Sequence, residues 1–307
     1  DVYKRQKSLG SRKLLETNEK TMISIGDVCP LFFKPLKYKY SNAGCFRQVF
    51  SLSDNILLQI FCDNGEIPLA SLNDKIGNIS SSIALLTYDV NESVKMYYAS
   101  LSPSEGIYTV TIGDKECEEF CVCENIGDSI LIEYSHKDNN SAFDNIFWID
   151  DVQQMFQFRI IGGFKPDGVD LKVENEQFVN QKQEIIEMYS LPYKTFDFVF
   201  GTSRGVPYYI AEFINKLLCL SHVNIDGNLY VREGDSVPEK LDTIGKKQMF
   251  IYKVTLRPRE NDIAGIGGKT EIATSSSGIA FLLTNPEEDD VLKYKKAQAA
   301  FVNENYV

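Results

Sequence analysis

Short apolar runs separated by turn residues fill the first half of the chain. Phe46–Ser53 and Ile56–Cys62 are two such runs, split by the turn pair Asp54-Asn55. Further runs follow at spacings of roughly 8–12 residues, the spacing of strands in a β-sandwich. These runs are Ile83–Tyr88, Val94–Ala99, Ile107–Ile112, Glu119–Cys123 and Ser129–Tyr134. We therefore predict an all-β sandwich over residues 22–150.

The second half opens with an apolar run at Met155–Ile161. Gly162-Gly163 and Pro166-Asp167-Gly168 follow it and predict turns, because glycine and proline interrupt regular structure. Residues 183–190 fit either a helical stripe or a strand, and the flanking pattern favours a strand. Phe196–Phe200 alternates phenylalanine with less apolar residues, which is typical of an antiparallel strand.

The clearest helical pattern of the chain follows that strand. Five apolar residues recur at i, i+3, i+4, i+7 and i+8: Ile210, Phe213, Ile214, Leu217 and Leu218. Pro207 stands near the start, where its missing N–H costs little. The spacing predicts an amphipathic helix of about 14 residues over Val206–Cys219.

A hairpin and one long strand are expected after the helix. Asp226-Gly227 lies between alternating residues in Val223–Val231, which is a strong hairpin signal. Phe250–Leu256 alternates regularly and Pro258 ends the strand. We predict a mainly β chain: the N-terminal sandwich, then a β-rich α+β module with one packed helix over residues 151–260.

The two ends differ from this pattern. Asp1–Gln6 has the sequence DVYKRQ and resembles the translation of a sequencing-library adapter, and residues 7–21 are polar without a strand pattern. We expect Met22 to be the true start and residues 1–21 to be spurious; the alternative is a real, disordered arm. Residues 261–307 begin rich in Gly, Ser and Thr and indicate a flexible linker and tail.

Charge and composition narrow the partners. The formal net charge is −11, which repels phosphate backbones and predicts no nucleic-acid partner. No run of about 18 apolar residues is present, so no membrane span is predicted. The chain has 7 cysteines, an odd number that favours reduced thiols in an intracellular compartment.

One motif suggests hydrolysis. Gly201–Gly205 matches G-x-S-x-G between a strand and a helix, with Ser203 as the would-be nucleophile. That serine needs a histidine base, and the chain has only His136 and His222. The predicted helix would place His222 roughly 20 Å away at ~1.5 Å per residue, and His136 belongs to the other domain. We expect a strand-to-helix loop and no enzyme.

Metal and cofactor motifs are incomplete. Cys117, Cys121 and Cys123 lack the paired spacing and nearby histidine of a zinc site, so we expect them to pack as small apolar groups. Asp138–Asp144 lacks the glycine and glutamate of a calcium loop. Gly267–Thr270 lacks the earlier glycine of a phosphate-binding loop. The sequence therefore predicts no catalytic set, metal or cofactor.

Aromatic residues offer a contact surface instead. Tyr97-Tyr98 and Tyr208-Tyr209 could contact a protein or stack on a sugar, with one tyrosine of each pair facing the core. Trp148 is expected to pack in a core. These tyrosines motivate an alternative function, a carbohydrate-binding or adhesin-like surface module that recognises a host-surface glycan.

Four segments together resemble the tail-tube-type and distal-tail modules of bacteriophages, with proteins of gut-metagenome phages the most similar in texture. They are Gln183–Val199, Val206–Cys219, Val223–Val231 and Phe250–Leu256. The resemblance implies a structural protein of a phage tail or baseplate, made in the bacterial host cytoplasm and incorporated in the virion. It implies a homo-oligomer that also contacts other tail proteins through β edges and loops, without catalytic residues. The N-terminal sandwich departs from that family pattern.

Overall fold

The fold is mainly β, as predicted. The computed structural model describes residues 13–16, 22–33, 46–63, 67–91, 93–139, 143–244 and 249–260. The expectations for Gly267–Thr270 and for residues 261–307 lie outside these ranges. Lys13–Glu16 forms strand β1, although the polar pattern of residues 7–21 predicted none; its pairing with Met22–Ile25 explains the difference.

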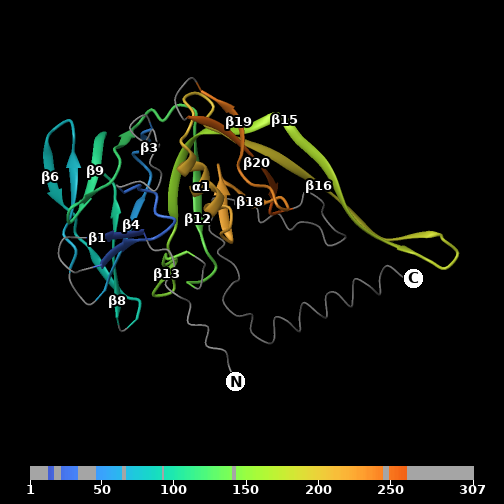
Figure 1. The fold of residues 1–307 in the computed structure, drawn as a ribbon, viewed down its shortest axis with the longest axis horizontal. Helices are drawn as coiled ribbons and strands as arrows, with labels where there is room; N and C mark the ends of the chain where they lie inside the picture. Colours follow the sequence, from blue (N-terminus) through green and yellow to red (C-terminus); the bar gives the residue numbers. More distant parts are fainter. Residues whose placement is uncertain are drawn as a thin grey trace, which may run out of the picture. The chain divides into compact units, whose positions relative to one another are not determined.

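Two sheets form the predicted sandwich (Figure 1). The first has the order β1-β2-β4-β8-β7, with β2 at Met22–Ile25, β4 at Ile56–Asp63, β8 at Val94–Leu101 and β7 at Leu86–Asp89. The second has the order β3-β11-β9-β5-β6, with β3 at Gln48–Ser51, β11 at Phe120–Cys123, β9 at Gly106–Ile112, β5 at Ala70–Asp74 and β6 at Ile79–Ser82. The short strand β10, Lys115–Glu116, pairs with β9.

The middle strand β4 is buried on both faces. Leu58 and Ile60 lie in the core between the two sheets, which also holds Val110 of β9. On the other face, Leu57 joins the core of the second module and Phe61 joins a small third cluster. The near-continuous apolar run of β4 follows from this double burial.

The third sheet closes on itself. Its order is β16-β15-β12-β17-β18-β20-β19, and β16 also pairs with β20, which completes a barrel of six strands. The strands are β12 (Ser129–Ser135), β15 (Phe156–Val179), β16 (Ile185–Phe200), β17 (His222–Ile225), β18 (Asn228–Arg232), β19 (Glu239–Thr243) and β20 (Phe250–Pro258). A separate small pair is formed by β13 (Trp148–Ile149) and β14 (Val152–Gln153). Strand β12 lies within residues 22–150, the range predicted to form the sandwich, but it belongs to this barrel.

The predicted helix and hairpin are both present. Helix α1, Tyr208–Leu217, packs its apolar stripe into the barrel core, where the rings of Phe213 and Phe158 lie 4.9 Å apart. Asp226 and Gly227 join β17 to β18 with φ of 52° and 83°. Two consecutive positive φ angles are the signature of the two-residue turn that matches strand twist.

The turns predicted at Gly162-Gly163 and Pro166-Asp167-Gly168 were wrong, because β15 continues through both. A side chain at Gly162 would collide with the backbone of Val199 and Phe200, so glycine permits close strand contact there. Phe164 pairs with Phe198 and Val169 with Phe196, so β15 has three more residues than β16 between these pairs. The Pro-Asp-Gly segment thus lies in a bulge within a strand.

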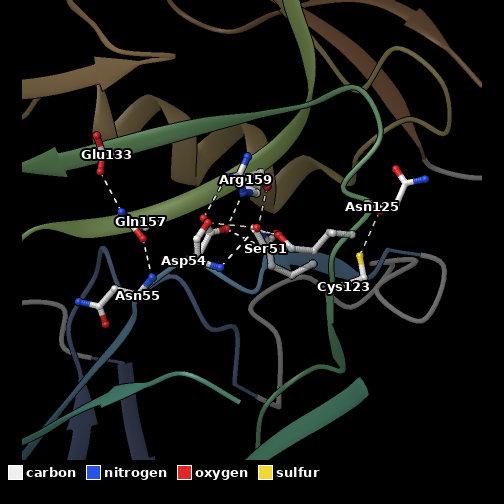
Figure 2. Close-up of polar contacts among 11 residues, drawn as sticks. Ser51, Asp54, Asn55, Cys123, Asn125, Glu133, Gln157 and Arg159 are labelled. Carbon is white, nitrogen blue, oxygen red and sulfur yellow. Dashed lines mark hydrogen bonds and ion pairs between the residues drawn. The ribbon is translucent and has the colours of Figure 1, made fainter. Parts of the chain in front are cut away.

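A buried ion pair joins the sandwich to the barrel (Figure 2). Arg159 on β15 donates from Nε to Asp54 Oδ2 at 2.5 Å and from Nη2 to Oδ1 at 2.9 Å. The side chains of Arg159 and Asp54 are 10% and 2% exposed. Ser51 N–H also donates to Asp54 Oδ2 at 2.7 Å, and Gln157 Oε1 accepts the N–H of Asn55 at 2.5 Å. The turn after β3 is therefore fastened to β15 by side-chain hydrogen bonds.

The substitution Arg159→Met should destabilise the fold by about 3–5 kcal/mol, because the Asp54 carboxylate would stay buried without its cation. Urea unfolding measures this change. The matched control is Arg47→Met, which removes an exposed ion pair with Glu119 and should cost less than about 1 kcal/mol. Equal effects of the two variants would contradict the role given to the buried pair.

Candidate assembly surface

The tyrosines proposed as a contact surface are divided between core and surface. Tyr97 lies in the sandwich core and Tyr209 in the barrel core, while Tyr208 is exposed and Tyr98 is half-buried. Tyr209 faces a core and Tyr208 does not, as predicted for that pair. Tyr97 and Tyr98 both contact a core, because Tyr98 packs against the barrel core and the third cluster. Trp148 packs at the barrel core and donates its Nε1–H to the His136 carbonyl at 2.9 Å. Tyr97 and Tyr209 cannot offer their rings to a sugar.

Ser203 lies in the loop between β16 and α1, where Gly201 and Gly205 have φ of 80° and 72°. His136 Nδ1 accepts the N–H of Ser221 at 3.1 Å, and His222 lies on β17 opposite Ser135. In the part of the chain that the structure describes, Ser203 makes no hydrogen bond to either histidine. A structural loop, as expected, accounts for the two glycines.

The three clustered cysteines differ in their surroundings. Cys117 is buried, accepts the N–H of Val110 at 3.0 Å and donates to the Glu118 carbonyl at 3.1 Å. Burial raises the pKa of the Cys117 thiol to about 12. Cys121 and Cys123 are half-buried on β11. Within the described ranges, no three His, Cys, Asp or Glu side chains converge as metal ligands, and no helix has the length and apolarity to span a membrane.

The most prominent feature outside the cores is a β-ribbon that extends from the barrel (Figure 1). Beyond Phe164 and before Phe196, strands β15 and β16 pair only with each other among the described strands. We name residues 165–195 the arm. Its turn is closed by Asn180, whose Oδ1 accepts the N–H groups of Lys182 and Glu184 at 2.9 Å. An isolated two-stranded ribbon is only marginally stable in water, so the arm is suited to gaining a partner.

Apolar side chains cover much of the arm. Val169, Leu171 and Val173 alternate along β15 and form an apolar stripe on one face, with Leu171 81% exposed. Further large apolar side chains are exposed toward the turn: Phe178, Val179, Ile185, Ile186 and Met188. Phe178 pairs with Ile186 and Val179 with Ile185, so these side chains lie on both faces of the ribbon. A group of exposed large apolar side chains is a candidate interaction site.

The opposite face of the arm is held to the barrel by a polar network. Glu233, just after β18, accepts hydrogen bonds from Lys172 Nζ at 3.1 Å and Tyr193 OH at 2.9 Å. The Arg257 guanidinium lies 3.9 Å from the centre of the Tyr193 ring and donates to Glu174 at 3.4 Å. Because side chains alternate between faces, these contacts leave the apolar stripe facing away from the network.

The chain matches none of the protein-family models, curated proteins or solved structures with which it was compared. A proposal about its function therefore rests on the geometry of the arm and on the resemblance of the sequence segments. Sequence reasoning missed the arm, although the alternation in Val169–Glu176 is a strand signal. The glycines and proline before that segment favour turns, which obscures the strand signal.

The polar network shifts the pKa of Tyr193. The hydrogen bond that Tyr193 donates to Glu233 raises the pKa of its hydroxyl, with desolvation and the charge of Glu233 adding to the shift. A raised folded-state pKa means that this contact is complete below the ordinary tyrosine pKa of about 10 and is lost as pH rises through the folded value.

Ultraviolet titration of the chain and of Tyr193→Phe should show, by difference, one tyrosine that ionises above that ordinary value. Glu233→Gln removes the charge of the acceptor and should move this ionisation down. A difference spectrum centred at or below a pH of about 10, unchanged by Glu233→Gln, would contradict the network.

Proposed function

We propose that the chain is a structural component of a phage tail or baseplate that associates with its neighbours through the arm. The observation that carries the proposal is the ribbon of residues 165–195, which exposes both strand edges and an apolar stripe while its base is fastened to the barrel. Exposed apolar side chains and open strand edges contribute little to the stability of the ribbon itself.

Energetic magnitudes favour association through this surface. Burying one Leu or Val side chain completely contributes about 1.5–3 kcal/mol. The arm exposes several such residues, and association costs an estimated ~4–15 kcal/mol. Burial of most of the apolar stripe and the tip could therefore offset that cost, whereas one or two contacts could not.

The class of assembly comes from the resemblance rather than from the arm. The four sequence segments that resemble phage tail modules contain most of β16, helix α1, the β17–β18 hairpin and most of β20. As such a component the protein would contact other tail proteins and copies of itself, and it would carry out no reaction. The carbohydrate-binding alternative would rest on Tyr208 and the half-buried Tyr98, because Tyr97 and Tyr209 are buried.

Light scattering behind a sizing column tests the proposal. The chain should elute as an oligomer, well above its monomer mass of 34.8 kDa. Leu171→Lys with Val173→Lys should return it to the monomer, because two charges would replace apolar contacts in the interface.

The matched control is Val237→Lys with Leu241→Lys, which introduces the same charge at two exposed apolar residues in or near β19. This control should assemble as the unmodified chain does. A monomeric unmodified chain, or an arm variant as large as the control, would refute the proposal.

A further inference from the structure

The strand edges that are protected against pairing with another chain, and those that are not, indicate which surface the arm contacts. This inference rests on the proposed function. Natural proteins protect exposed edges with proline, charge or bulges. The outer edge of β16 carries Pro192 and a bulge at Met188, where β16 has one residue more than β15. The edge strand β19 carries Glu239, Lys240 and Asp242. Both of these edges are therefore poor sites for adding a strand.

The edge of β15 is less protected. From Val169 to Val179 it contains no proline, no glycine and no inserted residue relative to β16. Its charged residues lie on the network face, where Lys172 contacts Glu233 and Glu174 contacts Arg257. The other face of this edge carries the apolar stripe. The β15 edge therefore lacks the features that block strand addition on its apolar side.

A second unprotected edge lies on the sandwich. Strand β6, Ile79–Ser82, is the last strand of its sheet, and all four residues are exposed. It contains no charge, no proline and no bulge, and it pairs regularly with β5. The exposed side chains of Ile76 and Ile79 provide apolar surface beside it. Figure 1 shows β6 on the far side of the sandwich from the arm, so an arm would reach it from another molecule.

The β15 edge could pair either with β6 or with the β15 edge of a second arm, and these two partners differ in charge. Two identical β15 edges could pair antiparallel around a twofold axis near the middle of the exposed segment. A centre at Val173 places Asp170 opposite Glu176 of the second copy, and it also places Lys172 opposite Glu174. A centre at Glu174 places that residue opposite itself and Lys172 opposite Glu176, and a centre at Asn175 places Glu174 opposite Glu176. Each of these registers therefore contains at least one pair of like charges, which two of them combine with pairs of opposite charge. Like charges directly opposite each other destabilise a strand pair.

Strand β6 has no charged residue, so pairing with β15 creates no such repulsion. Its Ile79 and Ser81 lie on one face and can continue the apolar stripe of the arm. We propose that the β15 edge of the arm in one copy pairs with β6 of a second copy. The contact is head-to-tail: each molecule uses its arm on one neighbour and its β6 edge on another. Repeated contacts of this kind build rings or filaments.

Mixing two variants tests this contact with the full chain. The arm variant is Leu171→Lys with Val173→Lys, and the edge variant is Ile79→Lys with Ser81→Lys. Each variant alone has lost one half of every contact and should be monomeric, with self-association weakened by roughly tenfold or more. An equal mixture should form a complex of two chains and no larger species, because one intact arm and one intact β6 edge remain.

The outcomes separate this inference from the proposed function. If the edge variant assembles as the unmodified chain does while the arm variant is monomeric, the β6 contact is refuted and assembly through the arm stands. A mixture that stays monomeric refutes the contact as well. An unmodified chain that is itself monomeric refutes both proposals.

Circular dichroism and thermal unfolding check that the variants fold. The four substituted residues are surface residues of regular strands, so lysine should be accommodated. If a lysine variant does not fold, serine at the apolar positions Leu171, Val173 and Ile79 removes the contacts without adding charge. The serine variants must then give the same pattern of masses for the contact to stand.

Discussion

Every backbone N–H and C=O group of a strand requires a partner, and β15 meets this requirement within the protein over only part of its length. From Phe156 to Ile161 it pairs with β12, but beyond Phe164 it is paired with β16 alone. Because β16 also leaves the barrel, the two strands form a ribbon with two open edges. The arm, its apolar stripe and its need for a partner all follow from this departure from the barrel.

The rest of the fold provides a rigid base for that ribbon. Arg159 and Asp54 fasten β15 to the sandwich, and Glu233 and Arg257 fasten the root of the arm to the barrel. The contacts to the barrel involve side chains on only one face of the ribbon. They limit the orientations that the ribbon can take relative to the barrel. The apolar face is held exposed before association, which reduces the ordering cost of binding.

Local patterns predicted much of this architecture and failed where pairing is non-local. The i, i+3, i+4 spacing around Ile214 and the turn at Asp226-Gly227 identified α1 and the β17–β18 hairpin correctly. Strand β6 has the sequence ISSS and no apolar alternation; it forms because β5 supplies its partner groups. The Arg159–Asp54 pair joins residues 105 positions apart, which no local pattern reveals. Likewise, Gly162 predicts a turn although its role is close contact between strands.

Hydrogen exchange of the amides between Val169 and Val179 tests the central claim most directly, because it reports on the backbone edge itself. In the assembled chain, the outward-pointing amides of this segment should exchange at least roughly tenfold more slowly than in the monomeric arm variant, while amides of the barrel core such as those of β12 stay unchanged. Equal exchange of the arm amides in both species would contradict the account, since the arm would then remain unpaired in the assembly.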